Sequence, residues 1–377
     1  MSGAPHLDTS RGLIQPKPVL GLHLPRARCS LVVLGTGTVG KALLRLLSAQ
    51  LGAAGATASL DVLAVANSRT MRIRRDVLRR CDWGRGELGG EAMDLDRLTQ
   101  LVADDVTAPP VIVDLTASHA VASRHLGWLS RGWHVVTANK IALTQSQAEY
   151  DALQAAAGGR YGYETTVGAA LPVIQTIRDL RLTGDRVAEI GGLLSGTLSF
   201  LFSGFDGRRP FSELVREAHG RGLTEPDPRI DLTGQDVARK LLILAREAGR
   251  RLEPEDIEVE SLVPASLAGC PPEEAFASLS LLDRPLQQRL DHAASQGSVL
   301  RYTARVKSGG QVRVGVNPVA ADHHLARLGY AENVIEIASR RYQPTPLTVR
   351  GPGAGAELTA AGVFADILKV TRQSSVD

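Results

Sequence analysis

One short segment constrains the fold of this chain more than any other. It is a GxGxxG fingerprint made of Gly35, Thr36, Gly37, Thr38, Val39 and Gly40. An apolar run, residues 30–34, precedes it, and a stretch with helical periodicity, residues 39–51, follows. Glycines at this spacing let the backbone approach a pyrophosphate, and the following helix offers unpaired N–H groups at its N-terminus. Three glycines could also form a plain tight turn, but the flanking strand and helix favour dinucleotide binding.

The rest of the first half repeats this alternation of strand and helix. Apolar runs recur at residues 60–66, 109–117 and 134–138, and helical stretches are expected at residues 120–131 and 145–157. Such alternation is typical of βαβ units that share a parallel sheet. The runs are almost wholly apolar, as expected when helices cover both faces of a sheet. We therefore predict an α/β protein with a Rossmann-like nucleotide-binding domain.

Gly158 and Gly159 mark a break, after which the pattern changes. A helix is expected to begin at Leu171-Pro172, and the expected strands follow at residues 188–194, 299–306, 311–316, 334–339 and 346–351. This predicts a second α/β domain with a mixed sheet. The expected parts are a loose extension at 1–28, a nucleotide-binding domain at 29–158 completed by a last helix within 345–377, and a substrate-binding domain at 159–344.

Composition excludes several classes of protein. The 43 Lys and Arg residues nearly balance 40 acidic residues and are spread along the chain, so nothing favours nucleic-acid binding. The longest uncharged stretch, residues 190–205, is shorter than the roughly 20 residues that a membrane span needs. No apolar signal region lies near the start, so we expect a cytoplasmic protein. Cys29, Cys81 and Cys270 are too widely spaced for a CxxC metal site and are expected to be reduced thiols.

The end of the second expected strand bears on the choice of cofactor. A site selective for NAD usually carries an acid there, which binds the ribose 2′-hydroxyl. This chain has Asn67, Ser68 and Arg69 instead. A guanidinium can bind a 2′-phosphate through paired hydrogen bonds, so Arg69 favours NADP, with NAD possible. The alternative is that Arg69 is an ordinary solvated loop residue.

A proline-stiffened acidic loop leads into a helix at residues 222–240. Asp236 and Lys240 are four residues apart, so they share a helix face. They could form an ordinary surface ion pair, and Thr233 with Asp236 could form a capping box. A second lysine, Lys140, follows the fourth expected strand at the sheet edge where ligands bind, although it could equally be a surface lysine.

The loop acids Glu225 and Asp231 favour a functional interpretation of this segment. Carboxylates can bind a substrate ammonium group. A lysine desolvated in a cleft, with a second cation nearby, can have its pKa lowered enough to exchange protons at neutral pH. This combination suits the reduction of an amino-acid aldehyde.

With these residues in place, the chain resembles homoserine dehydrogenases, and most closely the dehydrogenase part of bifunctional aspartokinase–homoserine dehydrogenases. The resemblance covers about residues 30–370. The motifs that carry it are GTGTVG, VANSRTM, VVTANK, YETTVGAALPVI, LSGTLSF, GLTEPDPRIDLTGQDVARKLLILARE and RGPGAGAELTAAGVFAD. GLTEPDP followed by DLTGQDVARK is the most specific of them.

The resemblance implies reversible interconversion of L-aspartate 4-semialdehyde and L-homoserine with NAD(P)(H), a step toward threonine, methionine and isoleucine. It implies that Lys240 donates the proton and that Lys140 assists. The substrate-binding residues it implies are Gly222, Glu225, Asp231 and Asp236. The family usually has an acid where this chain has Ile230, and we expect modest consequences.

Further expectations follow from the same resemblance. Nucleotide contacts beyond the glycine turn are implied at Thr116, Ala117, Ala138, Lys140 and Gly355. A monovalent cation, Na⁺ or K⁺, is implied at the Glu164 carboxylate and the carbonyls of Val167, Ala169 and Leu171. Glu164 could instead cap the helix that begins near Leu171. The family also implies a homodimer or homotetramer built through the second domain.

Two other interpretations remain. The chain could be another NAD(P)-dependent dehydrogenase for a small amino or hydroxy acid, or a nucleotide-sensing dimer without turnover. Neither Tyr150 nor Tyr163 has a lysine four residues later, as a short-chain dehydrogenase would need, and no cysteine lies in a site-like motif. We expect neither a kinase domain nor an ACT domain.

Overall fold

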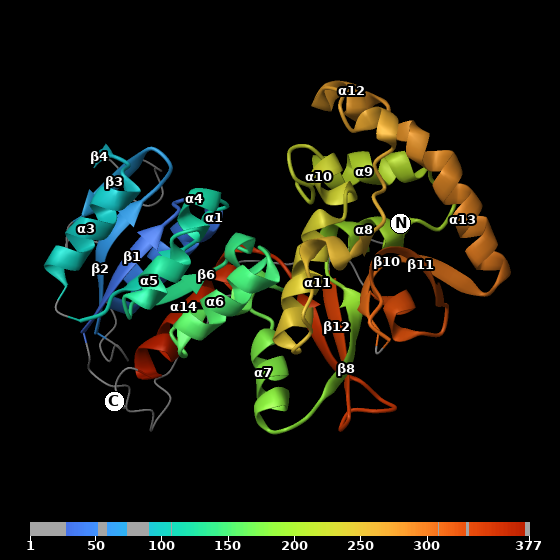
Figure 1. Ribbon diagram of the computed structural model, residues 1–377. Coiled ribbons are helices and arrows are strands. Elements are labelled where there is room, and N and C mark those ends of the chain that lie inside the picture. The colour runs from blue at the N-terminus through green and yellow to red at the C-terminus, as the bar shows by residue number, and fades with distance from the viewer. Residues whose placement is uncertain are drawn as a thin grey trace.

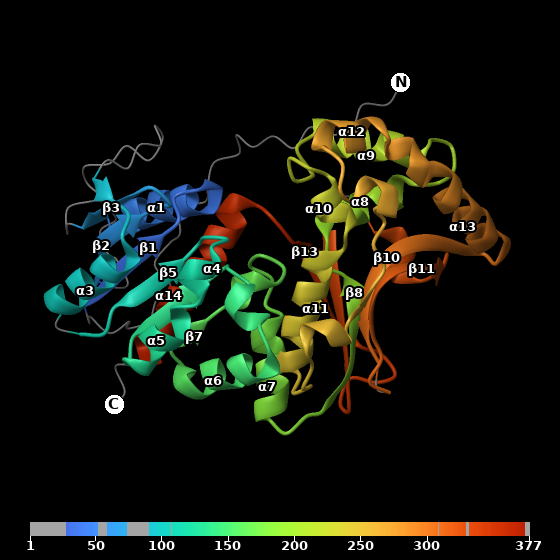
Figure 2. The same ribbon diagram turned by 45° about the horizontal axis from the view of Figure 1, so that its top comes forward.

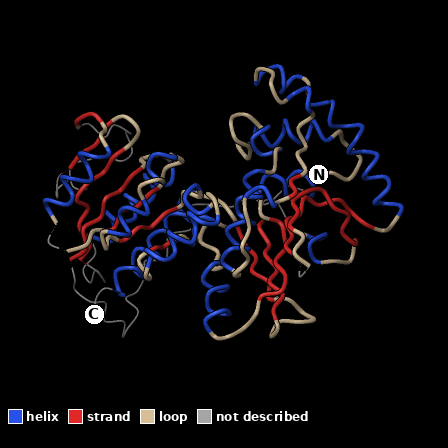
Figure 3. Tube along the Cα trace, in the orientation of Figure 1, coloured by secondary structure: helices blue, strands red, loops and turns tan. Residues whose placement is uncertain are grey.

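Two lobes lie side by side, each built around one β-sheet (Figure 1; Figure 3). The computed structural model describes residues 28–51, 59–73, 90–106, 108–307, 309–328 and 332–373. The first sheet has the strand order β4-β3-β2-β1-β5-β6-β7, and the second has the order β13-β12-β8-β10-β11-β9. The predicted fold class, a Rossmann-like domain with a second mixed-sheet α/β domain, is confirmed.

The centre of the first sheet is parallel and apolar. Its parallel strands are β1 (Arg28–Leu34), β2 (Ser59–Ala66), β5 (Val111–Asp114), β6 (His134–Thr137) and β7 (Tyr161–Gly162). Leu31, Val33 and Val113 are fully buried because helices cover the sheet. The longer helices after these strands are α1 (Thr38–Leu51), α3 (Leu95–Asp105) and α6 (Gln147–Ala157). Because β7 pairs with β6, the first sheet extends slightly past the boundary expected at residue 158.

Two antiparallel strands extend the sheet at its β2 edge. β3 (Thr70–Ile73) pairs with β2, and β4 (Glu91–Ala92) pairs with β3. The turn between β2 and β3 is shaped by Asn67, whose Oδ1 accepts the N–H groups of Arg69 (2.8 Å) and Thr70 (2.9 Å). An asparagine that binds the backbone two residues later favours a tight turn. The segment expected to carry the cofactor-selecting residues is therefore the turn of a hairpin.

The single helix expected at residues 120–131 is wrong. Two short helices, α4 (His119–Ala122) and α5 (His125–Ser130), lie there instead. Ser118 accepts a hydrogen bond from the Val121 N–H and so starts α4, and the hydroxyl of Ser123 bonds back to the carbonyl of His119 (2.8 Å). Hydrogen bonds of this local kind compete with helix continuation. The break lets the side chain of His125 turn into the interior.

The C-terminal helix α14 (Ala356–Gln373) returns to the first lobe, where it lies among the first-lobe elements in both views (Figure 1; Figure 2). Its buried residues Ala360, Val363 and Ile367 pack with Leu43 and Leu44 of α1. Strand β13 (Leu347–Pro352), just before it, belongs to the second sheet. Helix α14 therefore packs against the first lobe, while the strand before it belongs to the second sheet.

The second sheet is largely antiparallel. Its strands are β8 (Val187–Leu193), β9 (Glu258–Val259), β10 (Ser298–Val306), β11 (Val312–Ala320), β12 (Glu332–Ser339) and β13. Among the described strands of this sheet, only β9 and β11 pair in parallel, over a short length. Apolar side chains of α11 (Gln235–Glu247), including the fully buried Leu241 and Leu244, share a core with Tyr302 and Ala304 of β10. The helix that the sequence predicts from Leu171-Pro172 is α7, which begins at Ile174 (Ile174–Leu182).

Helix α11 also ties the two lobes together. The buried Arg246 donates to the carbonyl of Leu143 (2.8 Å), and Tyr163 donates to the carboxylate of Glu247 (2.6 Å). These contacts hold the helix that carries Asp236 and Lys240 against the first lobe. The other helices of the second lobe are α8 (Gly196–Gly204), α9 (Phe211–Gly220), α10 (Arg229–Leu232), α12 (Pro272–Ala277) and α13 (Asp283–Ser295).

Several sequence expectations concern the described cysteines and helices. Cys29 and Cys270 are free thiols, whereas Cys81 and the extension at 1–27 lie outside the described residues. Burial raises the pKa of the Cys29 thiol to about 12, so this cysteine is unreactive at neutral pH. No helix within the described ranges has the length and apolar character of a membrane span.

Candidate active site

The glycine turn follows β1 and leads directly into α1. The N–H of Gly35 donates to the carbonyl of Ala66 (2.8 Å), and its φ of +103° is one that other residues rarely adopt. A Cβ on Gly40 would lie 1.9 Å from the carbonyl oxygen of Gly35, whereas a Cβ on Gly37 would meet no atom within 4 Å. Gly35 and Gly40 are thus needed for the turn itself, and Gly37 keeps its outer side open to a ligand.

Beside this turn lies a cavity of about 560 Å³ at the carboxyl ends of β1, β2 and β5. This is where ligands bind in open parallel sheets. Of the predicted cofactor residues, Gly35, Thr116 and Ala117 line it. Asn67 and Ser68 also line it, together with Leu34, Ala66, Met93, Leu95, Ser118, Ala120 and Val121. The open glycine turn, the helix N-terminus and the cavity size all fit a dinucleotide.

Other predicted cofactor residues lie outside that lining. The side chain of Arg69 is exposed on the β2–β3 turn, next to the lining residue Ser68. Gly355, with a φ of +127°, immediately precedes α14. Ala138 follows β6, and its N–H donates to the carbonyl of Asp114 (3.1 Å). Their nucleotide contacts therefore remain predictions.

A carboxylate and two ammonium groups meet where the two lobes join. Asp236, in the first turn of α11, holds Lys240 at 2.8 Å through Oδ2 and Lys140 at 3.3 Å through Oδ1. Lys240 lies one turn further along α11, and Lys140 follows β6 of the other lobe. The suggested capping box is wrong, because the N-cap of α11 is Gly234, which has no side chain, and Thr233 bonds to the carbonyl of Ile230 (2.8 Å). Asp236 is thus free to bind the lysines.

The charges in this cluster depend on burial and on each other. Side-chain exposure is 12% for Lys240, 25% for Lys140 and 49% for Asp236. Burial lowers the pKa of Lys140, and the charge of Lys240 lowers it further, while Asp236 opposes both effects. Burial works to raise the pKa of Asp236, but the charges of Lys240 and Lys140 outweigh it and hold that pKa well below its usual range. Asp236 is therefore ionised at neutral pH.

Lys240 is oriented by a second acceptor. Its Nζ donates to the carbonyl of Leu194 (2.8 Å), the residue that follows β8. An ammonium group has three donors, and Asp236 and Leu194 account for two of them. The third can reach an oxygen of a ligand. A lysine held in this way has the geometry of a proton donor.

The acidic segment 222–231 follows α9 and runs into α10. Gly222 has a φ of +68°, so it makes the turn after α9. The N–H of the exposed Glu225 donates to Asp231 (2.8 Å), and the hydroxyl of Thr197 anchors the carbonyl of Leu223 (2.6 Å). Burial raises the pKa of Asp231, although the Glu225 N–H opposes this effect. Asp231 thus braces the loop and Glu225 is available to a ligand.

The residue that departs from the family pattern faces outward. Ile230 is 55% exposed, which is unusual among the large apolar side chains that the structure describes. Its backbone N–H donates to the carbonyl of Asp227 (3.0 Å), so the local turn forms without an acid at this position. The consequence of this replacement for activity stays a prediction.

Glu164 lies in η2 (Glu164–Thr166), before α7. Its carboxylate accepts three backbone N–H groups at the start of α7, those of Val173 (2.7 Å), Ile174 (2.7 Å) and Gln175 (2.8 Å). Burial nevertheless raises its pKa. The helix-capping role given as the alternative is therefore present, and a cation would have to share this carboxylate with three amides. The carbonyl residues predicted with it are Val167, Ala169 and Leu171, in the loop that connects η2 to α7.

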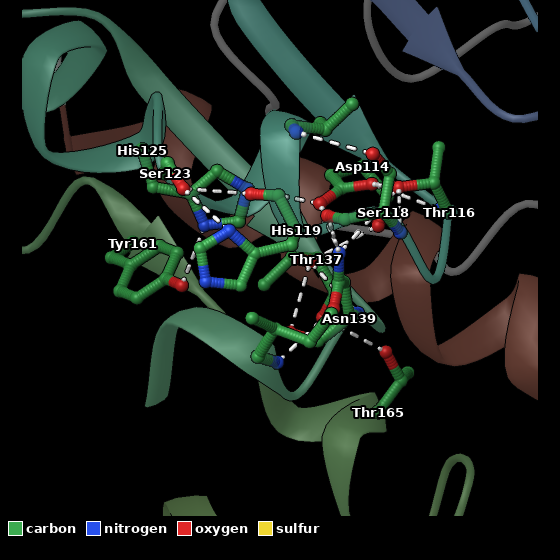
Figure 4. A network of polar contacts seen from close by, with 12 residues as sticks. Asp114, Thr116, Ser118, His119, Ser123, His125, Thr137, Asn139, Tyr161 and Thr165 are labelled. Atoms are coloured by element: carbon green, nitrogen blue, oxygen red, sulfur yellow. Dashed lines mark hydrogen bonds and ion pairs between the residues drawn. The ribbon is translucent and has the colours of Figure 1, made fainter. Parts of the chain in front are cut away.

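Sequence reasoning missed a buried polar network next to Lys140 (Figure 4). It is centred on Asp114, which is fully buried at the end of β5, and it includes His125 and Asn139. Two signals in the sequence were available. Asp114 is a single acid at the end of an otherwise apolar run, and Asn139 directly precedes the predicted catalytic lysine.

A glycine turn with a cavity beside it and a lysine pair at the lobe boundary are features expected of a dinucleotide-dependent oxidoreductase. Two family models match most of the chain. One, described as homoserine dehydrogenase, matches residues 172–368, and the other, its NAD-binding domain, matches residues 35–162. The chain belongs to the homoserine dehydrogenase family.

Individual relatives agree with this assignment. The chain is 41% identical over 371 residues to the bifunctional aspartokinase/homoserine dehydrogenase 2 of Escherichia coli, a match that covers 94% of this chain and 45% of that protein. The chain thus spans less than half the length of the curated relatives it matches.

Solved structures share the fold. A Candida auris protein of unknown function superposes with a TM-score of 0.83 at 34% identity, covering 91% of this chain and 98% of that one. An Archaeoglobus fulgidus protein provisionally assigned as a homoserine dehydrogenase superposes with a TM-score of 0.71 at 26% identity, covering 91% and 99%.

Proposed function

We propose that this chain interconverts L-homoserine and L-aspartate 4-semialdehyde with a nicotinamide dinucleotide. The observation that carries the proposal is the placement of Lys240 and Lys140 on the single carboxylate of Asp236, at the boundary of the two lobes. Family membership supplies the substrate class. The lysine cluster supplies the proton chemistry that the reaction requires.

The bound nicotinamide supplies the hydride for aldehyde reduction and accepts it in the reverse direction. Reduction of an aldehyde leaves an alkoxide, which has to be protonated. Lys240 donates this proton from Nζ, which Asp236 and the Leu194 carbonyl hold in place (2.8 Å each). Lys140, whose pKa burial lowers, polarises the carbonyl or relays the proton. A positioned general acid of this kind contributes about 10²- to 10⁴-fold.

The substrate is an amino acid, so its ammonium group needs acceptors. Asp236, Glu225 and the backbone of Gly222 provide them in this proposal. Asp231 acts through Glu225, because it accepts the N–H of that residue (2.8 Å). One carboxylate that serves both the lysines and the substrate would link binding to proton transfer.

Cofactor choice, cation and assembly complete the proposal. NADP is preferred, with NAD possible, because Arg69 lies on the turn beside the lining residues Asn67 and Ser68 and no acid is present there. A monovalent cation, Na⁺ or K⁺, binds near Glu164. The chain forms a homodimer or homotetramer through the second lobe. If activity is unchanged when Na⁺ and K⁺ are rigorously replaced by other cations, the proposed role of the monovalent cation is contradicted.

The proton-donor assignment is tested by Lys240→Met. This variant should fold and bind NADPH within about twofold of the wild type, because Lys240 belongs to the substrate side, while turnover of L-homoserine falls about 10²- to 10⁴-fold. Lys307→Met is the control, since Lys307 is an exposed lysine directly after β10 and has no role in the proposed site. Its turnover should stay within about twofold of the wild type. Near-normal turnover of Lys240→Met would remove the assignment.

A further inference from the structure

The carboxylate of Asp114 is the centre of a buried hydrogen-bond network (Figure 4). Its Oδ1 accepts the backbone N–H (2.9 Å) and the hydroxyl (2.7 Å) of Thr116. Its Oδ2 accepts the side-chain amide of Asn139 (3.0 Å) and lies 3.0 Å from His125 Nε2. Asp114 and His125 are both fully buried. A carboxylate removed from water is tolerated because donors surround both of its oxygens.

His125 joins this carboxylate to β7. Its Nδ1 lies 2.9 Å from the hydroxyl of Tyr161, on the other side of the ring from Asp114. A neutral imidazole has one donor and one acceptor nitrogen. The tautomer that donates from Nε2 to Asp114 and accepts the Tyr161 O–H at Nδ1 satisfies both contacts. In the neutral ring, this one tautomer satisfies both hydrogen bonds and so sets the orientation of the His125 side chain.

On one side, the network shapes the loop that lines the dinucleotide cavity. Thr116 and Ser118 both belong to that lining. The hydroxyl of Thr116, which donates to Asp114, also accepts the N–H of Ser118 (3.1 Å). The carbonyl of Ser118 in turn accepts the amide of Asn139 (3.1 Å). The course of the cavity loop thus depends on Asp114 and Asn139.

On the other side, the network fixes the turn that carries Lys140. Asn139 is 3% exposed, and its amide binds Asp114 and Ser118 while its Oδ1 accepts the N–H of Ile141 (3.0 Å). Asn139 therefore connects the backbone just after Lys140, at Ile141, to Asp114 and Ser118. The Nζ of Lys140 then reaches Asp236 at 3.3 Å.

We propose that Asp114 and His125 are positioning residues that hold the cofactor loop and the Lys140 turn as one unit. Dinucleotide binding and the placement of Lys140 then depend on the same buried carboxylate. The part that concerns turnover rests on the proposed function. The part that concerns dinucleotide binding does not.

The main test is Asp114→Asn, which keeps the shape of the side chain but replaces one acceptor oxygen with a donor. Either the donors of Thr116 or those of Asn139 and His125 then face an NH₂ group instead of an acceptor oxygen. We expect the NADPH dissociation constant to rise about tenfold and kcat with L-homoserine to fall about 100-fold, since a displacement of about 1 Å can cost that much. Asp185→Asn is the control, because Asp185 is another buried carboxylate that accepts a side-chain hydroxyl (Ser339, 2.6 Å), but lies in the second lobe.

Two further experiments separate positioning from a general structural role. In a Lys140→Met background, Asp114→Asn should lower kcat little further, because its kinetic effect acts through Lys140, but it should still weaken NADPH binding about tenfold. His125→Gln can still donate to Asp114, so it should retain most of the activity that His125→Leu loses. These His125 variants keep the proposal testable if Asp114→Asn fails to fold.

The proposal is overturned if folded Asp114→Asn binds NADPH and turns over as Asp185→Asn does. It is also overturned if the kcat loss remains complete in the Lys140→Met background, or if His125→Gln and His125→Leu behave alike. Absence of homoserine turnover in the wild type would instead remove the proposed function. The NADPH titrations would then decide by themselves whether Asp114 holds the cofactor loop.

Discussion

Two aspartates support the same lysine in opposite ways. Asp236 binds Lys140 directly, at 3.3 Å, and is 49% exposed. Asp114 acts through the backbone around Lys140, by way of Asn139, and is fully buried. The partners of Asp236 are two ammonium groups, whereas those of Asp114 are amides, a hydroxyl and an imidazole. A closed network fixes geometry, while an open charged cluster remains able to bind a ligand and exchange a proton.

This difference predicts where stability and activity are sensitive. Buried donors that lose their acceptor cost free energy, because water cannot replace it. A half-exposed ion pair contributes little to stability, because water screens it. Substitutions at Asp114 should therefore lower stability more than substitutions at Asp236, which should lower turnover while leaving the fold nearly unchanged.

The largest effect is expected for Asp114→Ala. It leaves Thr116, Asn139 and His125 without their buried acceptor, so the free energy of unfolding should fall by about 3–5 kcal/mol. Asp236→Ala should change it by less than about 1 kcal/mol. Urea unfolding of the two variants and the wild type measures both values. Equal losses would show that the two regions do not differ as described.

The second prediction separates turnover from dinucleotide binding. Asp236→Ala removes the acceptor that holds both lysines and the proposed site for the substrate ammonium. We expect kcat/KM for L-homoserine to fall about 100-fold, with NADPH binding within about twofold of the wild type. Steady-state kinetics and a fluorescence titration check this. A parallel loss of NADPH affinity would contradict the separation of the two regions.

Acid should weaken the first lobe before it protonates Asp236. Burial, together with the charge of Arg160, lowers the pKa of His134 in β6 from 6.5 to about 4. The folded protein then binds fewer protons than the unfolded chain between these values, so this contribution is complete above pH 6.5 and is lost as the pH falls toward 4. At pH 4.5 the loss should be about 2 kcal/mol. The depressed pKa of Asp236 acts only below its ordinary value of 3.8.

Unfolding at pH 7.5 and pH 4.5 tests this, with His134→Gln as the comparison. The wild type should lose more stability between the two pH values than the variant. Equal losses in the two proteins would assign the acid sensitivity to another group.

The smallest effect is expected for Arg69→Ala. Because Arg69 is exposed, its bond to a 2′-phosphate would be screened, and NADP⁺ affinity should fall only about three- to tenfold. NAD⁺ affinity should be unchanged. Titration of the variant with both dinucleotides gives the ratio of the NADP⁺ and NAD⁺ affinities. An equal loss of affinity for both would mean that Arg69 does not bind the 2′-phosphate.

Local patterns in the sequence predicted part of this structure well. The glycine turn was predicted from spacing alone. Gly35 and Gly40 lie where the strand turns sharply into the helix, and neither position has room for a Cβ. Asp236 and Lys240 share a face because they are four residues apart. Lys140, in contrast, comes from the other lobe, and it was expected near them because it follows a parallel strand at the sheet edge where ligands bind.

The missed features depend on contacts between distant segments. Asp114 and His125 are polar residues in apolar surroundings, and nothing local indicates that they bind each other. The break between α4 and α5 depends on side-chain hydrogen bonds of Ser118 and Ser123 that helical periodicity does not register. The β3–β4 edge, likewise, was not distinguishable from a loop.

The most direct test of the central claim is the initial rate of NADPH formation from NADP⁺ by the purified wild-type chain with L-homoserine. A parallel reaction with 4-hydroxybutanoate, which lacks the ammonium group, serves as the comparison. We predict saturable turnover with L-homoserine and at least about 100-fold lower kcat/KM with the analogue, because the carboxylates at the lysine cluster would have no ammonium to bind. No turnover of L-homoserine by folded, dinucleotide-binding protein, or equal turnover of both compounds, would contradict this account.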